Sequence, residues 1–267
     1  MLSQPSIYGI NLRVSPRIGG KTYFRKLKNS FLIEIQCNGN KLFPEFICEV
    51  REVLDKLDLD HIDKPELRDN LDKVIEIQYL IIRNSPIRIL TDIIDGKKSL
   101  KRLKLINISL ANGWKWGPVF SQLNMLMDFQ LKETKLPTDQ LVISGDEDQM
   151  TNNNMISFSV NKCDIQTIES NITKKWIHLK MISLAHNCIQ ELNRDWLPPK
   201  LESLWSLDFS YNNISWIPED FFGGMTALRK LRLDNNGFTT LHEMWFRHIW
   251  EGLHELWIDR KLTLICR

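Results

Sequence analysis

Only a few residues in this chain have types and spacings that could support catalysis or cofactor binding. Gly20, Lys21 and Thr22 match the end of a G-x-x-x-x-G-K-T phosphate-binding loop, but Ser15 stands where its first glycine should be. The acidic residues 146–148 are better explained as a solvated loop than as paired catalytic carboxylates. We therefore expect neither a nucleotide site nor a carboxylate-based active site.

Histidine and cysteine side chains do not form a recognisable reactive site either. His242, His248 and His254 recur every six residues, a spacing that matches neither a helix nor a strand, so we expect no metal site. The sequence contains no G-x-S-x-G motif, and no cysteine stands in an evident nucleophile context. The chain is therefore expected to be neither an enzyme nor a cofactor-binding protein.

A repeat of apolar residues runs along nearly the whole chain and must position any binding residues. The pattern L-x-x-L-x-L-x-x-N-x-L, with apolar residues in the L positions, recurs ten times at intervals of 22 to 29 residues. The copies open at Leu32, Leu54, Ile77, Leu100, Leu126, Met155, Leu179, Leu204, Leu228 and Leu253. Alternation at L-x-L predicts a short strand with one apolar face. Because one such unit cannot bury that face alone, the copies must stack into a solenoid of about ten turns with a continuous parallel sheet.

The asparagine position of the repeat predicts how each turn is held together. A side-chain amide has two donor hydrogens and an acceptor, so it can satisfy backbone groups where the chain leaves the strand. The position holds Asn40, Asn187, Asn212 and Asn236, or the partial substitutes Ser85, Thr134 and Cys163, or the unsuitable Ile62, Ile108 and Lys261. We expect the hydrogen-bond ladder to be most regular from Leu179 to Leu241 and least regular in the second and fourth repeats.

The chain resembles leucine-rich repeat proteins over nearly all of its length. After Asn212 it reads Ile214-Ser-Trp-Ile217-Pro218-Glu-Asp-Phe221, which is similar to the I-x-x-I-P-x-x-x-F register of animal cell-surface and secreted repeats. The resemblance implies an α/β solenoid, a horseshoe with a parallel β-sheet on the concave face and a mostly irregular or short-helical convex side. It also implies a non-catalytic module that recognises a protein ligand or receptor.

Two compartments are compatible with the sequence. The repeat register favours an extracellular or cell-surface protein, and the alternative is a cytoplasmic adaptor or regulatory subunit. The N-terminus has no apolar signal-peptide core, and a truncated chain would reconcile this with the extracellular register. The N-x-S/T triplets at Asn107, Asn171 and Asn213 are as many as chance would produce, so they do not decide between the alternatives.

The chain divides into three expected segments. Residues 1–31 are basic and hold a faint earlier repeat, residues 32–252 hold the array, and residues 253–267 hold the last repeat and the entry to a cysteine-rich C-terminal cap. The five cysteines are Cys37, Cys48, Cys163, Cys188 and Cys266. We expect buried free thiols, and a Cys37–Cys48 disulfide is the alternative.

Charge and hydropathy narrow the class of partner. The net charge is +2, from 35 basic and 33 acidic residues, so no overall field attracts nucleic acid or a membrane surface. The sequence contains no apolar run long enough to cross a bilayer. We therefore expect a protein partner, no nucleic acid and no membrane span within this chain.

The residues that flank the apolar positions of each strand should project from the concave face. Two groups have the aromatic and cationic composition of interface anchors. The N-terminal patch is Tyr79, Ile81, Arg83, Arg102 and Lys104, and the C-terminal patch is Asp208, Tyr211, Arg232, Asp234 and Trp257. We predict that both patches bind the partner.

Two further features lie between the strands. We expect packing along the convex side for Trp176, Trp196, Trp216, Trp245 and Trp250. The longer repeats carry insertions at residues 112–117 and 144–154, which should loop out and are additional candidate binding elements.

Overall fold

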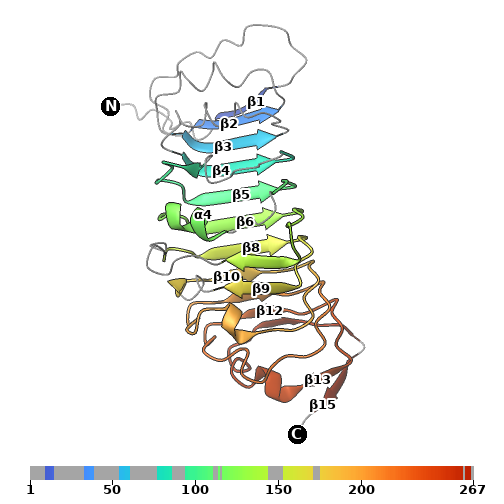
Figure 1. Ribbon diagram of the computed structural model, residues 1–267. Coiled ribbons are helices and arrows are strands. Elements are labelled where there is room, and N and C mark those ends of the chain that lie inside the picture. The colour runs from blue at the N-terminus through green and yellow to red at the C-terminus, as the bar shows by residue number, and fades with distance from the viewer. Residues whose placement is uncertain are drawn as a thin grey trace, which may run out of the picture.

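The computed structural model describes residues 10–14, 33–38, 54–60, 77–85, 94–110, 114, 116–143, 153–170, 175–260 and 262–265. Within the first three strands, only the side chain of Asp58 is described. Eleven strands form one sheet in the order β1-β2-β3-β4-β5-β6-β8-β10-β11-β12-β14. Figure 1 shows the strands of this sheet stacked one beside the next, with β1 at one end of the stack and β12 toward the other.

The elements are short, and most of them are strands. The large sheet contains β1 (Ile10–Val14), β2 (Ile33–Asn38), β3 (Leu54–Asp60), β4 (Ile77–Arg83), β5 (Arg102–Ile106), β6 (Asp128–Lys132), β8 (Ser157–Asn161), β10 (Met181–Ser183), β11 (Ser206–Asp208), β12 (Lys230–Arg232) and β14 (Glu255–Trp257). Two smaller parallel sheets pair β7 (Gln140–Ile143) with β9 (Thr167–Ser170), and β13 (Thr240–His242) with β15 (Thr263–Ile265). The described helical segments are α4 (Gly117–Gln122) and the 3-10 turns η2 (Arg194–Trp196) and η3 (Glu243–Phe246).

The strand positions follow the repeat. From β2 to β14, each strand of the large sheet begins within two residues of a predicted repeat opening. All neighbouring pairs are parallel, and equivalent apolar positions stand side by side, as Leu80, Leu103 and Phe129 do. These apolar side chains are buried in one continuous core behind the sheet. The predicted parallel solenoid with little helix is confirmed.

Aromatic side chains fill the core where the repeats are longest. The Phe120 ring of α4 lies 5.0 Å from that of Phe129 and 5.1 Å from that of Trp176 between centroids. Trp116 contacts the Phe129 ring at 5.2 Å and is only 1% exposed. The prediction that residues 112–117 loop out is therefore wrong for Trp116, because its large ring packs into the core. The second insertion, residues 144–154, lies almost wholly outside the described residues.

The tryptophans between the strands divide into two groups. Trp176, Trp196 and Trp245 are buried, as predicted. Trp216 and Trp250 are 50% and 64% exposed, so the packing prediction is wrong for these two. The edge of Trp216 still contacts buried Trp245, with ring centroids 5.1 Å apart.

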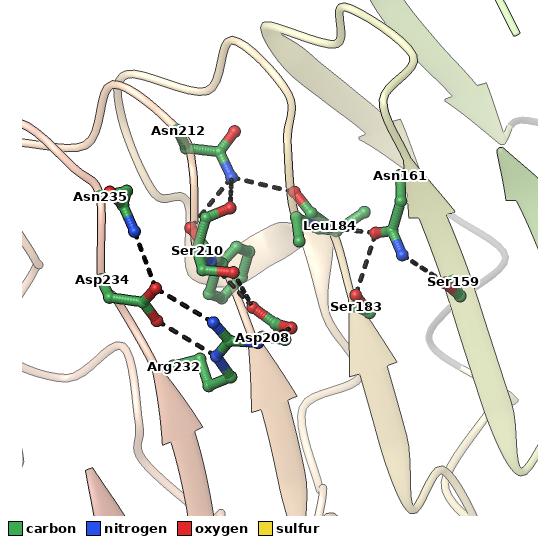
Figure 2. Close-up of polar contacts among 12 residues, drawn as sticks. Ser159, Asn161, Ser183, Leu184, Asp208, Ser210, Asn212, Arg232, Asp234 and Asn235 are labelled. Atoms are coloured by element: carbon green, nitrogen blue, oxygen red, sulfur yellow. Dashed lines mark hydrogen bonds and ion pairs between the residues drawn. The ribbon is translucent and has the colours of Figure 1, made fainter. Parts of the chain in front are cut away.

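The asparagine positions hold the turns in the way the sequence predicted. Asn212 donates to the carbonyl oxygens of Leu184 (2.9 Å) and Phe209 (3.0 Å), and its Oδ1 accepts from the Ile189 N–H (3.1 Å). Part of this arrangement is visible in Figure 2. Asn187 and Asn236 repeat the pattern in the neighbouring turns. One amide thus links two successive repeats.

The substituted positions make fewer or weaker bonds. Thr134 accepts from the Ile108 N–H at 3.3 Å and donates to the Lys132 carbonyl at 3.1 Å. The Cys163 thiol reaches the Asn161 carbonyl at 3.2 Å. Ile108 has no side-chain donor or acceptor, so the fourth repeat is irregular as expected. Positions 40, 62 and 261 lie outside the described residues.

A regular feature that the repeat pattern did not predict is the backbone conformation of the residue before seven of the asparagine positions. This residue has a positive φ, between 47° and 58°, at Asn84, Asn107, Glu133, Lys162, His186, Tyr211 and Asn235. The left-handed conformation lets its N–H continue the ladder of bonds to the next repeat, as Tyr211 does to the Asp234 carbonyl at 2.9 Å. Side chains of this column contact one another in pairs: Asn84 with Asn107, Glu133 with Lys162, and His186 with Tyr211. We call these residues the left-handed column.

Candidate partner-binding face

Two rows of side chains run across the face of the sheet that is turned away from the core. The first contains Tyr79, Arg102, Asp128, Ser157, Met181, Ser206, Lys230 and Glu255. The second contains Asp58, Ile81, Lys104, Gln130, Ser159, Ser183, Asp208, Arg232 and Trp257. In-register parallel pairing places equivalent side chains on adjacent strands about 4.8 Å apart.

The N-terminal patch carries two cations beside an aromatic ring. The guanidinium carbon of Arg102 lies 5.9 Å from the centre of the Tyr79 ring, within the range of a cation–π contact. Lys104 is flanked in its row by the uncharged Ile81 and Gln130. Arg102 is exposed and Lys104 is half-buried. These groups are available to a partner.

Two predicted members of this patch have other roles. Ile81 was expected to be an exposed aliphatic anchor, but only 3% of it is exposed. Arg83 forms two hydrogen bonds of 3.0 Å with the carboxylate of Asp58, which stands level with Ile81 on the neighbouring strand. Arg83 is two residues beyond Ile81 on the same face, so its side chain must pass beside Ile81 to reach Asp58. The prediction that Ile81 is an exposed anchor is therefore wrong. The charge of Arg83 is neutralised within the chain by Asp58.

Small polar side chains form the centre of the face. Ser157, Ser159, Ser183 and Ser206 occupy the rows between β8 and β11. Asn161 donates to the hydroxyl of Ser159, and its Oδ1 accepts from the hydroxyl of Ser183, both at 2.9 Å (Figure 2). The floor between the two patches, from β8 to β11, is therefore uncharged and internally hydrogen-bonded, and Met181 lies in it between Ser157 and Ser206.

The C-terminal patch is organised around Arg232. Its guanidinium donates to both carboxylate oxygens of Asp234, at 3.1 and 3.0 Å, and lies 3.8 Å from the Asp208 carboxylate (Figure 2). The Asp234 hydrogen bonds raise the pKa of Arg232. The same guanidinium lies 5.5 Å from the centre of the Trp257 ring. The indole is 55% exposed, so a partner can contact the side of the ring that faces solvent.

Tyr211 is placed at the margin of this patch by its left-handed backbone. Its φ is 57°, and its ring stacks on His186 at 4.0 Å with an interplanar angle of 11°. The ring is 44% exposed. Beneath it, the Asp208 carboxylate accepts from both the N–H and the hydroxyl of Ser210. The structure thus brings together the five predicted members of the C-terminal patch.

Four neighbouring residues, Met181, Trp205, Lys230 and His186, were not among the predicted binding residues. Met181 and Trp205 are 43% and 36% exposed, and Lys230 lies 5.6 Å from the centre of the Trp205 ring. Lys230 also pairs with Glu255 at 2.7 Å, which lowers the pKa of that carboxyl. His186 belongs to the C-terminal patch because its ring stacks on that of Tyr211. The sequence signal that could have identified His186 is its position directly before Asn187.

The described residues do not assemble a reactive centre. Among them, no group of three or more histidine, cysteine, aspartate or glutamate side chains could hold a metal ion. His242 packs against Trp245, and His248 lies 3.3 Å from Asp220, so the three histidines do not converge. Burial raises the pKa of the Cys163 thiol to about 12, which disfavours the nucleophilic thiolate. In the same part of the chain, no helix is long and apolar enough to span a membrane.

Comparison with known proteins gives a consistent result for the fold. The Leucine Rich Repeat family profile matches residues 203–225. A leucine-rich repeat protein of Leptospira interrogans superposes with a TM-score of 0.63 and 22% identity, over 86% of this chain and 55% of that one. Toll, in its complex with Spatzle from Drosophila, superposes with a TM-score of 0.61 and 17% identity, over 87% of this chain and 34% of Toll. No curated protein matches the sequence.

The chain therefore has a leucine-rich repeat fold, a solenoid of stacked parallel strands. It spans about half the length of the Leptospira chain and about a third of that of Toll. At these identities the similarity establishes the fold and leaves the partner to be inferred from the residues.

Proposed function

We propose that this protein is a non-catalytic recognition module that binds a protein partner through the concave face. The observation that carries the proposal is the C-terminal patch, where exposed aromatic side chains are held in place by buried or paired neighbours. Trp257 lies over Arg232, and Tyr211 is stacked on His186. Tryptophan, tyrosine and arginine dominate the binding energy of protein interfaces, and ordering them beforehand reduces the entropy lost on binding.

The proposed compartment is extracellular or the cell surface. Its support is the register that begins at Ile214, because Ile217, Phe221 and Met225 are fully buried as the secreted repeat type requires. The irregular convex side and the similarity to Toll are further support. The alternative is a cytoplasmic adaptor, which is favoured by the free thiols of Cys163 and Cys188 because reducing compartments preserve free thiols.

Glycosylation separates the two compartments. Asn213 is exposed and belongs to an N-x-S triplet, whereas the Asn107 amide donates to the side chain of Asn84 at 2.7 Å. A secreted protein should carry a glycan at Asn213, detected as a mobility shift on endoglycosidase treatment of protein from its native cells. Loss of the shift in the Asn213→Gln variant would identify the site. An unmodified native protein would favour the cytoplasmic alternative.

The binding surface is tested with a partner identified by cross-linking and confirmed with purified proteins. The Trp257→Ala, Tyr211→Ala and Arg102→Ala variants should each bind more weakly than the parent. Trp250→Ala is the matched control, because this indole is 64% exposed and lies outside both rows. If Trp250→Ala weakens binding while the other three variants fold and bind normally, the concave face is not the site.

A further inference from the structure

The two patches differ in how their charges are satisfied. Arg232 is held between Asp208 and Asp234, so its positive charge is largely neutralised within the chain. The charge of Arg83 is likewise neutralised by an ion pair with Asp58, whose side chain is only 5% exposed. In contrast, among the described residues no carboxylate forms an ion pair with Arg102 or Lys104.

The surroundings of Arg102 and Lys104 leave their charges uncompensated. Asp128 is next to Arg102 in its row, but its carboxylate oxygens accept from Gln130 at 3.3 Å. The described residues from 94 to 110 include Lys97, Lys98, Lys101, Arg102 and Lys104 against the single acid Asp95. The Tyr79 ring beneath Arg102 also limits where the guanidinium can move. A positive charge that is held in position and forms no ion pair with any described carboxylate is suited to receive an anionic group.

We propose that Tyr79, Arg102 and Lys104 form a docking point for a carboxylate-bearing segment of the protein partner. This inference rests on the proposed function and specifies the chemistry at one end of the binding face. The bidentate guanidinium receives one carboxylate, Lys104 on the same strand receives the same or an adjacent one, and the Tyr79 ring contacts the apolar part of the acidic side chain.

A protein segment fits this point better than a nucleic acid does. A nucleic acid presents a regular series of phosphates and needs a continuous track of cations. Here Asp58 lies on the strand before Tyr79, and Asp128 lies on the strand after Arg102. Beyond them lies the neutral floor formed by Ser157, Ser159 and Ser183. The open charge is therefore local, which matches one or two carboxylates.

The test uses the full chain and a short fluorescein-labelled peptide rich in glutamate, with a glutamine peptide of the same length as its neutral counterpart. We expect the glutamate peptide to bind about tenfold more tightly at low salt and to lose this advantage at high salt. The Arg102→Ala/Lys104→Ala variant should abolish the difference, and Arg102→Lys/Lys104→Arg should retain most of it. The Lys98→Ala/Lys135→Ala variant is the control, because it removes the same charge from two exposed lysines outside the rows.

Three results would overturn the inference. These are equal binding of the two peptides, equal loss in the control variant, or displacement of the peptide by a single-stranded RNA that binds more tightly. The proposed function is judged separately, because Trp257→Ala would still weaken binding of the protein partner if only the acidic docking point were wrong. Folding of each variant is checked by its thermal unfolding midpoint.

Discussion

The C-terminal half of the array is regular and Arg232 of its concave patch is paired with carboxylates, whereas the described part of the N-terminal half is less regular and leaves Arg102 and Lys104 without an ion pair among the described residues. Between Leu179 and Leu241, asparagine amides link successive turns with several hydrogen bonds each. In the N-terminal half, Thr134 makes two such bonds and Ile108 makes none with its side chain. The two concave patches differ in the same way, since Arg232 forms ion pairs with carboxylates and Arg102 forms none with the described residues.

This difference implies that the two patches, on one continuous sheet, contribute to binding in different ways. A neutralised patch with exposed aromatic rings gains binding energy mainly by excluding water, and this energy depends little on salt. An open cationic patch accelerates encounter with an acidic surface and depends strongly on salt. The neutral serine floor separates the two.

The largest effect is expected from the turn ladder. Asn212→Ala should lower the free energy of unfolding by about 1–3 kcal/mol, because the Ile189 N–H and the Leu184 and Phe209 carbonyls lose a buried partner. Asn213→Ala, at an exposed neighbour, should cost less than about 0.5 kcal/mol. Denaturant titrations measure both. Equal shifts would contradict the assigned register.

The next effect concerns the aromatic anchor. Trp257→Ala should weaken partner binding by about 2 kcal/mol with little change on raising the salt concentration, because the lost contact is apolar. Arg102→Ala should instead reduce the association rate and the salt dependence. Surface plasmon resonance at two ionic strengths distinguishes these outcomes. If the two variants showed similar salt dependence, the proposal that the two patches contribute to binding in different ways would be wrong.

A smaller effect is expected where a thiol replaces the usual amide. Cys163→Asn should stabilise the fold by about 0.5–1 kcal/mol, because an amide makes stronger hydrogen bonds to backbone carbonyls than the thiol makes to Asn161 at 3.2 Å. The thermal midpoint and denaturant titration report the change. A loss of stability would mean that the turn at this repeat has a shape that excludes the amide and that its irregularity is built into the backbone.

The smallest effect tests whether charge pairing alone separates the patches. Asp208→Asn/Asp234→Asn should free Arg232 and increase affinity for the glutamate peptide by about threefold at low salt. The same measurement on Arg102→Ala/Lys104→Ala removes the contribution of the N-terminal patch. If the double asparagine variant gains nothing in that background, the two patches differ by more than their ion pairs.

The repeat pattern alone was sufficient for the architecture and the strand register. Each apolar position recurs near one period, so Leu80, Leu103 and Phe129 had to stack in one core, and the residues between them had to share one surface. The role of Asn212 could be predicted for the same reason, since its bonds within the turn and to the preceding repeat recur in every regular turn. The grouping of Asp208, Arg232 and Trp257 also followed from register.

Contacts that depend on side-chain reach were decided only by the tertiary structure. The repeat placed Arg83 and Ile81 on the concave face, but the bond from Arg83 to Asp58 and the burial of Ile81 depend on rotamers that cross between strands. The stack of His186 on Tyr211 depends on a left-handed backbone that asparagine, glutamate, lysine, histidine and tyrosine all occupy in this array. Sequence periodicity determines which face a residue occupies, because backbone geometry repeats. Which charges remain open on that face is decided by pairwise geometry among neighbours about 25 residues apart in sequence, which a periodic pattern does not encode.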